Sequence, residues 1–233
     1  MAGPPQGPKR SWAVVFDLDG VLVESEGAWD AARRALVAQA GGTWREEATR
    51  AMLGMSAPEW SRYVHEELGV DLAPEEIDAR VVERVLEEYR HALPLLPGAV
   101  AAVRALAARW PLGLASSSNR LVIDAVLELA GIASDFAVTV SSEEVARGKP
   151  APDVYEAAIA KLGVTASHAV AIEDSSNGLR AAAAAGMHLI AVPNREFPPA
   201  PEALALAELA LGSLELLVPA TIAAIERRGG RLS

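Results

Sequence analysis

The chain has 233 residues, of which 51% are hydrophobic and 22% charged, a balance typical of a globular protein. Its net charge of −10 disfavours binding to nucleic acid, and its lack of cysteine excludes disulfides, thiolate catalysis and cysteine-based zinc sites. No run of about 18 apolar residues is present, so we expect no transmembrane helix and no membrane partner. Residues 1–10 lack the apolar stretch of a signal peptide, and we therefore expect a cytoplasmic protein.

The first predicted element is a buried strand, Ala13–Phe16, that is followed by two carboxylates. Asp17 and Asp19 come after this apolar run with one residue between them, and Gly20 follows. Buried charges must be paired, bound to a metal ion or neutralised, so these acids need partners elsewhere in the chain. Taken alone, an Asp-x-Asp pattern is more often a loop or a helix cap than a catalytic site.

Residues 27–93 contain no predicted strand, and their apolar residues have helical spacing, as Trp60 and Val64 illustrate. We interpret this stretch as a small helical bundle inserted after the first strand. The predicted organisation is therefore an α/β core domain made of residues 1–26 and 94–233, with a helical cap domain made of residues 27–93.

From residue 94 onward, short apolar strands alternate with helices. The predicted strands are 111–115, 136–140, 168–172, 188–192 and 208–211, and the predicted helices are 100–109, 121–130, 152–162, 177–185 and 214–227. This alternation is typical of a parallel sheet with right-handed crossovers. The predicted fold class is α/β, with a Rossmann-like parallel sheet as its core and an inserted helical domain.

Polar side chains follow several predicted strands, at the sheet edge where ligands bind in open α/β folds. The polar groups at this edge are Asp17 and Asp19 after the first strand, Ser116–Asn119 after the second, Lys149 after the third, and Glu173 and Asp174 after the fourth. The acids are hard oxygen ligands suited to Mg²⁺, and the lysine and hydroxyls can bind an anion. A hard cation beside an anion site is what phosphoryl transfer requires.

The two first-strand acids can divide the chemistry between them. In an extended stretch, residues i and i+2 point the same way, so Asp17 and Asp19 would both face the substrate. One can attack phosphorus as a carboxylate nucleophile, and the other can protonate the leaving oxygen and later take a proton from water. Lys149 would neutralise the remaining charge and also bind Asp17. The predicted substrate-binding residues are Ser116, Ser117, Asn119 and Lys149.

Four segments resemble the sequence motifs of the haloacid dehalogenase superfamily, in its phosphatase and β-phosphoglucomutase-like branch. They are Phe16–Leu22 (FDLDGVL), Leu114–Ser118 (LASSS), Gly148–Asp153 (GKPAPD) and Ile172–Gly178 (IEDSSNG). One such motif is a weak signal, whereas four in order with this spacing are specific. The resemblance covers nearly the whole chain, including a helical cap after the first motif.

The resemblance implies a role for each of these polar residues. It implies that Asp17 is a nucleophile that forms an aspartyl-phosphate, and that Asp19 is the acid and base whose backbone carbonyl also binds Mg²⁺. It implies that Ser116 and Lys149 hold the phosphoryl group. The implied metal ligands are Asp17, Asp19, Glu173 and Asp174.

The predicted cap departs from the β-phosphoglucomutase pattern at two positions. Trp29 stands where those enzymes have a histidine, and Ala57 stands where they have an arginine. We therefore predict an Mg²⁺-dependent phosphomonoester hydrolase acting on a small phosphorylated metabolite such as a sugar phosphate. A phosphomutase and a non-catalytic phosphometabolite-binding protein are the alternatives. We expect a monomer or a weak dimer.

Overall fold

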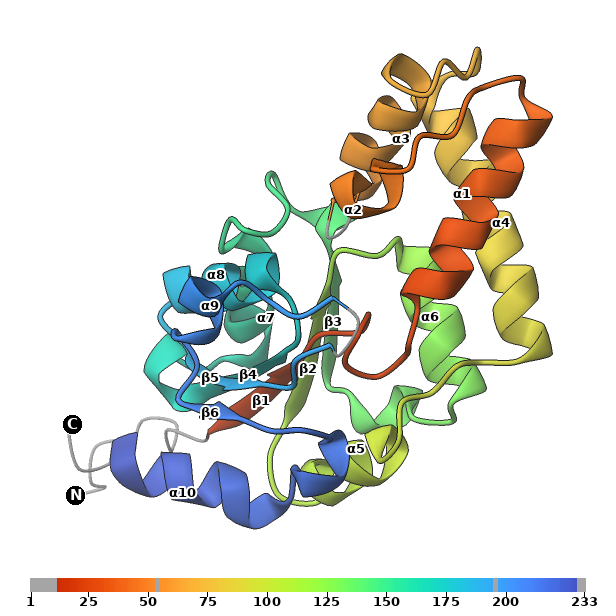
Figure 1. Ribbon diagram of the computed structural model, residues 1–233. Coiled ribbons are helices and arrows are strands. Elements are labelled where there is room, and N and C mark those ends of the chain that lie inside the picture. Colours follow the sequence, from red (N-terminus) through yellow and green to blue (C-terminus); the bar gives the residue numbers. More distant parts are fainter. Residues whose placement is uncertain (1–11, 53–54, 195–196, 230–233) are drawn as a thin grey trace, which may run out of the picture.

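A parallel sheet lies at the centre of the computed structural model, which describes residues 12–52, 55–194 and 197–229 (Figure 1). Residues 1–10, from which we expected no signal peptide, lie outside the described residues. The strands are β1 (Ala13–Phe16), β2 (Leu112–Ser116), β3 (Val138–Ser141), β4 (Ala169–Glu173), β5 (His188–Ala191) and β6 (Leu209–Ala210). Their order is β3-β2-β1-β4-β5-β6, and every neighbouring pair is parallel. The predicted α/β fold class is confirmed.

The strand order places β1 at the point where the chain changes direction across the sheet. From β1 the chain proceeds outward to β2 and β3, and it then returns to β4 on the other side of β1. Val14 is in register with Leu112 of β2 and with Val170 of β4. The crevice at such a switch point, above the carboxyl ends of the strands, is the usual ligand site of open α/β sheets.

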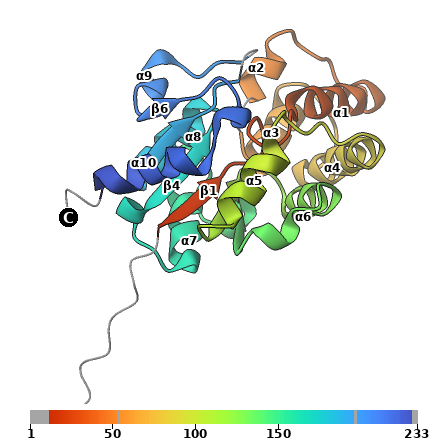
Figure 2. The same ribbon diagram turned by 90° about the horizontal axis from the view of Figure 1, so that it is seen from below.

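Helices cover both faces of the sheet, which explains why its central strands are continuously apolar. The face that bears Val14 and Phe16 packs against α5 (Ala99–Ala107), α6 (Arg120–Leu129) and α10 (Pro219–Gly229), and Figure 2 shows α5 and α10 beside β1. The face that bears Val15 packs against α7 (Asp153–Leu162), α8 (Ser176–Ala184) and α9 (Pro201–Leu204).

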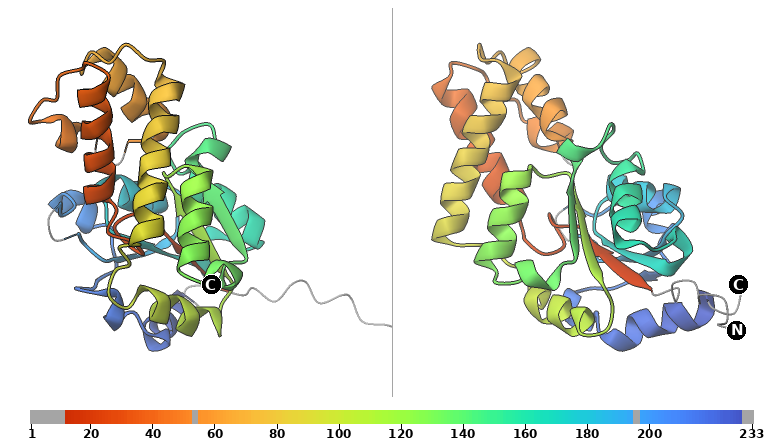
Figure 3. Two further views of the ribbon diagram at one scale, coloured as in Figure 1. Left: turned by 90° about the vertical axis from the view of Figure 1, so that its right-hand side faces the viewer. Right: turned by 180° about the vertical axis from the view of Figure 1, so that it is seen from behind.

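The described residues between 26 and 91 form four helices that stand beside the sheet rather than on either of its faces (Figure 1). They are α1 (Glu26–Gln39), α2 (Ala48–Met52), α3 (Ala57–Glu66) and α4 (Pro74–His91). The helices α1 and α4 lie side by side (Figure 3), and the buried rings of Trp29 and Trp60 meet edge to face at 6.0 Å. Their apolar faces pack together, and the buried cluster that they form continues into the core beneath the Val14 and Phe16 face of the sheet.

The two chain segments that join these helices to the sheet are hydrogen-bonded to each other. Val23 and Leu95 form an antiparallel bridge, and the Glu24 backbone N–H donates to the Pro94 carbonyl at 2.8 Å. The predicted domain boundaries lie at these segments, and the division into two domains stays a prediction.

One local expectation differs from the structure. The predicted helix 214–227 is wrong in its first part, because Leu214–Leu216 is a 3-10 turn and α10 begins only at Pro219, a residue favoured in a first helical turn but not in a helix interior. Further 3-10 turns are Ala133–Asp135, Ser142–Glu144 and Ala166–His168. Among the described residues, no helix is both long enough and apolar enough to cross a membrane.

Candidate active site

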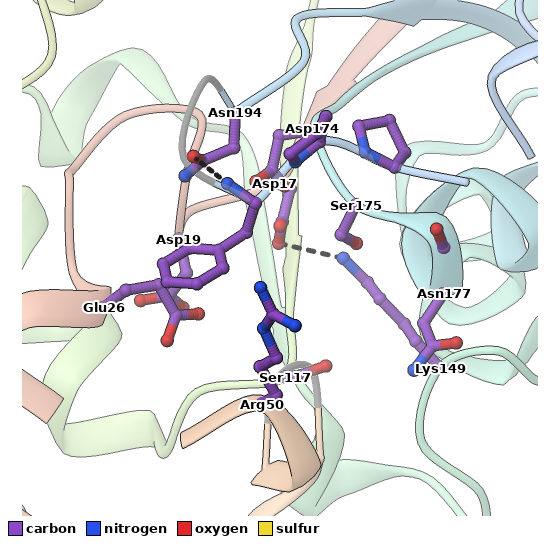
Figure 4. Close-up of a pocket in the computed structure, with 14 residues that line it drawn as sticks. Asp17, Asp19, Glu26, Arg50, Ser117, Lys149, Asp174, Ser175, Asn177 and Asn194 are labelled. Atoms are coloured by element: carbon purple, nitrogen blue, oxygen red, sulfur yellow. Dashed lines mark hydrogen bonds and ion pairs between the residues drawn. The ribbon is translucent and has the colours of Figure 1, made fainter. Parts of the chain in front are cut away.

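The carboxyl ends of β1, β2 and β4 open onto one cavity of about 450 Å³ (Figure 4). Five of the predicted site residues line it: Asp17, Asp19, Ser117, Lys149 and Asp174. They come from segments more than 150 residues apart in sequence. The parallel sheet therefore brings these predicted polar groups together at one edge.

Lys149 connects two of the acids. Its Nζ lies 2.9 Å from Asp17 Oδ1 and 2.7 Å from Glu173 Oε1, and all three side chains are buried. Nζ also lies 4.9 Å from the centre of the Tyr155 ring. Burial opposes the positive charge, but Asp17 and Glu173 outweigh it and raise the pKa of Lys149. The lysine is therefore a permanent cation beside Asp17.

Glu173 holds this lysine in place. Its Oε1 accepts hydrogen bonds from Lys149 Nζ and from the Tyr155 hydroxyl, at 2.7 and 2.9 Å. Its Oε2 accepts from the backbone N–H groups of Asp174 and Ser175 and from the Ser175 hydroxyl, at 2.9, 3.1 and 3.1 Å. Five donors fill the lone pairs of this carboxylate, which is completely buried.

Two glycines make room for the acids. Gly20 has a φ of +73°, and a Cβ on it would lie 2.0 Å from Asp174 Oδ2. A Cβ on Gly178, in the first turn of α8, would lie 1.6 Å from Glu173 Oε1. Both glycines belong to the motifs quoted above, but spacing alone did not reveal their role. The role of Gly20 depends on a carboxylate from a distant segment, and that of Gly178 depends on a carboxylate that folds back over the start of α8.

The donor set fits a divalent cation. Asp17, Glu173 and Asp174 each offer a carboxylate oxygen, and these oxygens lie within 4.8 Å of one another. Burial raises the pKa of Asp17 to about 7, and burial followed by the charge of Glu173 raises the pKa of Asp174. Asp174 Oδ1 is buried and has no hydrogen-bond partner in the described part of the chain. Lys149 neutralises only one of these carboxylates, so the cluster keeps an excess of negative charge. Mg²⁺, which prefers hard oxygen ligands, would balance it.

Asp19 is oriented by two serines, one at the end of β2 and one just after it. The Ser118 hydroxyl donates to Asp19 Oδ2 at 2.6 Å, and the Ser116 hydroxyl does so at 3.3 Å. Asp19 Oδ1 has no hydrogen-bond partner among the residues described. Ser118 belongs to the predicted polar segment Ser116–Asn119 but not to the predicted substrate-binding residues. Ser116, which does, is completely buried and does not line the cavity that Ser117 lines.

Comparison with known proteins decides the family. A model of the haloacid dehalogenase-like hydrolases matches residues 13–186. The chain belongs to this family. The resemblance drawn from the four motifs is thereby confirmed.

Several relatives of this hydrolase have named activities. This chain is 33% identical to hexitol phosphatase B of Escherichia coli over 219 residues, which cover 89% of this chain and 94% of that protein. It is 30% identical to the phosphorylated carbohydrates phosphatase of Thermotoga maritima, over 76% of this chain and 83% of that protein. The predicted enzyme class, a phosphatase of this family, is confirmed.

A solved structure supports the same assignment. The crystal structure of CbbY from Rhodobacter sphaeroides in complex with phosphate has a TM-score of 0.82 and 28% sequence identity to this hydrolase. The match covers 91% of this chain and 99% of that one. The likeness therefore includes the helices α1–α4 as well as the sheet.

Asn119 takes part in a contact between the helical region and the sheet region of the hydrolase. Its Nδ2 donates to Asp78 Oδ2 of α4 and to Glu143 Oε1, both at 2.9 Å. Asn119 does not line the large cavity, but it lines a smaller one of about 70 Å³ on the side of α1. Burial raises the pKa of Asp78 to about 6.

The sequence did not reveal part of the cavity wall. Phe197, Pro198 and Pro199 lie in a proline-rich segment that contains none of the predicted site residues, yet they line the cavity. The Arg50 side chain of α2 points into the cavity from the side opposite β1, and Glu26 lies beside Asp19 (Figure 4). Their helical segment had no predicted position relative to the sheet, so no sequence signal marked them.

Proposed function

We propose that this hydrolase is an Mg²⁺-dependent phosphatase of small sugar or polyol phosphates that forms an aspartyl-phosphate on Asp17. The observation that carries the proposal is the buried pair of Asp17 and Lys149, with Asp19 and Asp174 lining the same cavity. This arrangement combines a nucleophile, a fixed counter-charge, an acid and a metal ligand. Phosphoryl transfer depends mainly on positioning and charge neutralisation of this kind.

In the first step, a carboxylate oxygen of Asp17 attacks the phosphorus of the bound ester. The bond from phosphorus to the leaving oxygen breaks, and Asp19 gives its proton to that oxygen. Asp19 Oδ2 is held by Ser118, whereas Oδ1 has no partner among the described residues, so Oδ1 is the atom that serves the leaving group.

In the second step, Asp19 takes a proton from a water molecule, and the oxygen of that water attacks the phosphorus of the aspartyl-phosphate. The bond from phosphorus to Asp17 breaks, inorganic phosphate is released, and both carboxylates return to their starting forms. Lys149 stays charged throughout, because Asp17 and Glu173 stabilise its cationic form. Ser117 lines the cavity and donates to the phosphoryl oxygens together with Lys149.

Asp17 and Asp174 would hold the magnesium ion through their carboxylates, and Asp19 through its backbone carbonyl. When bound, the ion reduces the repulsion between the nucleophile and the phosphate dianion. Glu173 was predicted as a further ligand. We propose instead that it acts as a positioning residue, because its oxygens already accept hydrogen bonds from five donors.

The helices α1–α4 act as a cap that selects the leaving group. Glu26 and Arg50 reach the cavity from these helices, opposite the strand ends (Figure 4). The names of two relatives, hexitol phosphatase B and phosphorylated carbohydrates phosphatase, support a sugar or polyol phosphate as the substrate class.

Phosphate release from a panel of sugar and polyol phosphates, with and without Mg²⁺, tests the proposal. We expect release only with Mg²⁺ and at least about a thousandfold less release from Asp17→Asn, since the nucleophile is lost. If the wild type releases no phosphate from any ester but converts β-glucose 1-phosphate to glucose 6-phosphate, it is a phosphomutase. If it binds the esters and transforms none, it is a binding protein.

A further inference from the structure

Arg33 on α1 is a buried cation that the proposed chemistry does not use. It is 8% exposed, and its guanidinium lies 5.2 Å from the Trp29 ring centre and 4.8 Å from that of Trp60. Among the described residues it makes no hydrogen bond or ion pair, and its buried Nε has no partner. A guanidinium carries five donors, and burying it without acceptors is costly. The two rings offset only part of this cost.

Arg33 lines the cavity of about 70 Å³ that lies beside the larger one. The two cavities share Asp19, Glu26 and Ser117, so a leaving group at Asp19 can extend from one into the other. Buried polar atoms are nearly always hydrogen-bonded in folded proteins. The residues that line the small cavity nevertheless contribute several buried polar atoms without a partner in the described chain: Asp19 Oδ1, Ser25 Oγ, Arg33 Nε and Asn119 Oδ1.

The orientation of Asn119 makes it an acceptor toward a ligand. Its Nδ2 already donates to Asp78 and Glu143, so its amide group is fixed and only Oδ1 is left to form a bond. Glu26 adds a second acceptor. It lies two helical turns before Arg33 on the same face of α1, and it lines both cavities.

Apart from Asp19, which serves the leaving oxygen, the set of free groups therefore contains a strong donor, Arg33, and acceptors at Glu26 and Asn119. A hydroxyl group both donates and accepts, and can satisfy both kinds at once. A second phosphate or carboxylate only accepts, so it could satisfy Arg33 but would leave the acceptor Oδ1 of Asn119 without a donor. The chemistry of the small cavity thus matches a neutral, polyhydroxylated leaving group.

We propose that Arg33, Glu26 and Asn119 recognise hydroxyl groups of the leaving alcohol, so that the hydrolase selects esters of neutral polyols or sugars over esters that carry a second acidic group. This inference rests on the proposed phosphatase function. It assigns the choice of substrate to a face of α1, and it makes Arg33 a residue that determines specificity.

Three six-carbon esters test the inference: sorbitol 6-phosphate, hexyl phosphate, which lacks the hydroxyls, and 6-phosphogluconate, which adds a carboxylate. We expect the wild type to have the highest kcat/KM for sorbitol 6-phosphate. Arg33→Met should lower this kcat/KM about tenfold to a hundredfold more than that for hexyl phosphate, as the loss of a hydrogen bond to a charged group implies. Arg33→Lys, which keeps the charge, should give an intermediate loss.

Arg34→Met is the matched control. Arg34 is the next residue of α1, and its guanidinium lies 4.7 Å from the Trp44 ring centre, but it is exposed and lines neither of these cavities. This variant should preserve the ratio of the two kcat/KM values within about twofold, as expected for a surface substitution. Thermal unfolding of each variant separates lost recognition from lost folding.

Equal losses on sorbitol 6-phosphate and hexyl phosphate would overturn the inference. A wild-type preference for 6-phosphogluconate that Arg33→Met removes would also overturn it, and would show that Arg33 binds an anion. If the wild type hydrolyses none of the three esters, the proposed phosphatase function fails on this panel. Calorimetric titration of sorbitol 6-phosphate into Asp17→Asn, with and without Arg33→Met, then decides the inference separately, and equal affinities would contradict it.

Discussion

Lys149 Nζ lies 2.9 Å from Asp17 Oδ1, and both side chains are buried. The nucleophile of the proposed reaction is therefore fixed by an ion pair before any substrate binds. Glu173 extends this pair to a buried triad, because it binds the same Nζ at 2.7 Å. Burial raises the pKa of Asp17, and Lys149 lowers it only in part, because the triad of two carboxylates and one ammonium keeps one negative charge.

Replacing Lys149 should damage both activity and folding. Lys149→Met leaves Asp17 and Glu173 buried without a counter-charge, and we expect a loss of about 3–5 kcal/mol in the free energy of unfolding. We expect phosphatase activity to fall at least about a hundredfold, since the phosphoryl charge is no longer neutralised. Urea unfolding and phosphate release measure the two effects.

Lys161→Met is the control for this prediction. Lys161 pairs with Glu144 at 2.9 Å on the surface, where its side chain is 49% exposed. Such pairs contribute about 0–1 kcal/mol. A stability loss in Lys149→Met no larger than in Lys161→Met would show that the buried triad does not stabilise the fold.

Gly178→Ala should impair the hydrolase although alanine favours helices. A Cβ at this position would lie 1.6 Å from Glu173 Oε1, so the carboxylate that holds Lys149 would have to move. We expect at least about a tenfold loss of kcat with a smaller change in KM, because the nucleophile's counter-charge is displaced. Gly27→Ala, in the first turn of α1, is the matched control, since its nearest neighbour would be 3.8 Å away. Unchanged kcat in both variants would contradict the role given to Gly178.

Asp174→Asn should remove the response of the protein to Mg²⁺. A ligand that binds only the folded state stabilises it by about 2.7 kcal/mol at one hundred times its Kd. We therefore expect Mg²⁺ to raise the melting temperature of the wild type and to leave that of Asp174→Asn unchanged. Asp71→Asn, at an exposed position between α3 and α4, should respond as the wild type does. A full Mg²⁺ response in Asp174→Asn would exclude Asp174 as a ligand.

Asp78→Asn should stabilise the protein at neutral pH but not in acid. Burial raises the pKa of Asp78 from 3.8 to about 6, so the folded state holds this proton more tightly than the unfolded state. The contribution of Asp78 to stability therefore falls as the pH rises from about 4 to about 6. An asparagine avoids this loss and can still accept the hydrogen bond from Asn119.

The expected gain for Asp78→Asn is about 1–2 kcal/mol at pH 7.5, reduced from the full linkage value because the side chain is partly exposed. At pH 4 the variant and the wild type should have the same free energy of unfolding. Urea unfolding at the two pH values measures this difference. A gain of equal size at both would show that Asp78 does not titrate in this range.

The sequence predicted which polar residues meet at the strand ends, because the strands of a parallel sheet all end at the same edge. Asp17, Lys149 and Asp174 each follow a predicted strand of an alternating pattern, and the parallel arrangement then brings them to one edge. Their residue types indicated a metal and an anion site without any knowledge of distances. The four motifs further restricted the family.

The rest of the site depends on packing that local sequence does not encode. Spacing predicted that residues 27–93 are helical, but not which face of α1 meets the strand ends. Glu26 and Arg33 therefore gave no signal. The role of Gly178 was equally hidden, since it appears only when the Glu173 side chain folds back over the start of α8. The helix that begins at Pro219 was extended too far because apolar spacing continues through the turn before it.

The most direct test of the central claim is to trap the phosphoryl group on Asp17. Asp19→Asn removes the base that activates water, and p-nitrophenyl phosphate has a leaving group that needs no protonation. After rapid acid quenching of this variant with Mg²⁺ and p-nitrophenyl phosphate, mass spectrometry should find one phosphoryl group on the peptide that contains Asp17. A variant with both Asp17→Asn and Asp19→Asn should carry none. Wild-type turnover with no phosphorylated Asp17 in Asp19→Asn, or turnover by Asp17→Asn at the wild-type rate, would contradict the aspartyl-phosphate mechanism.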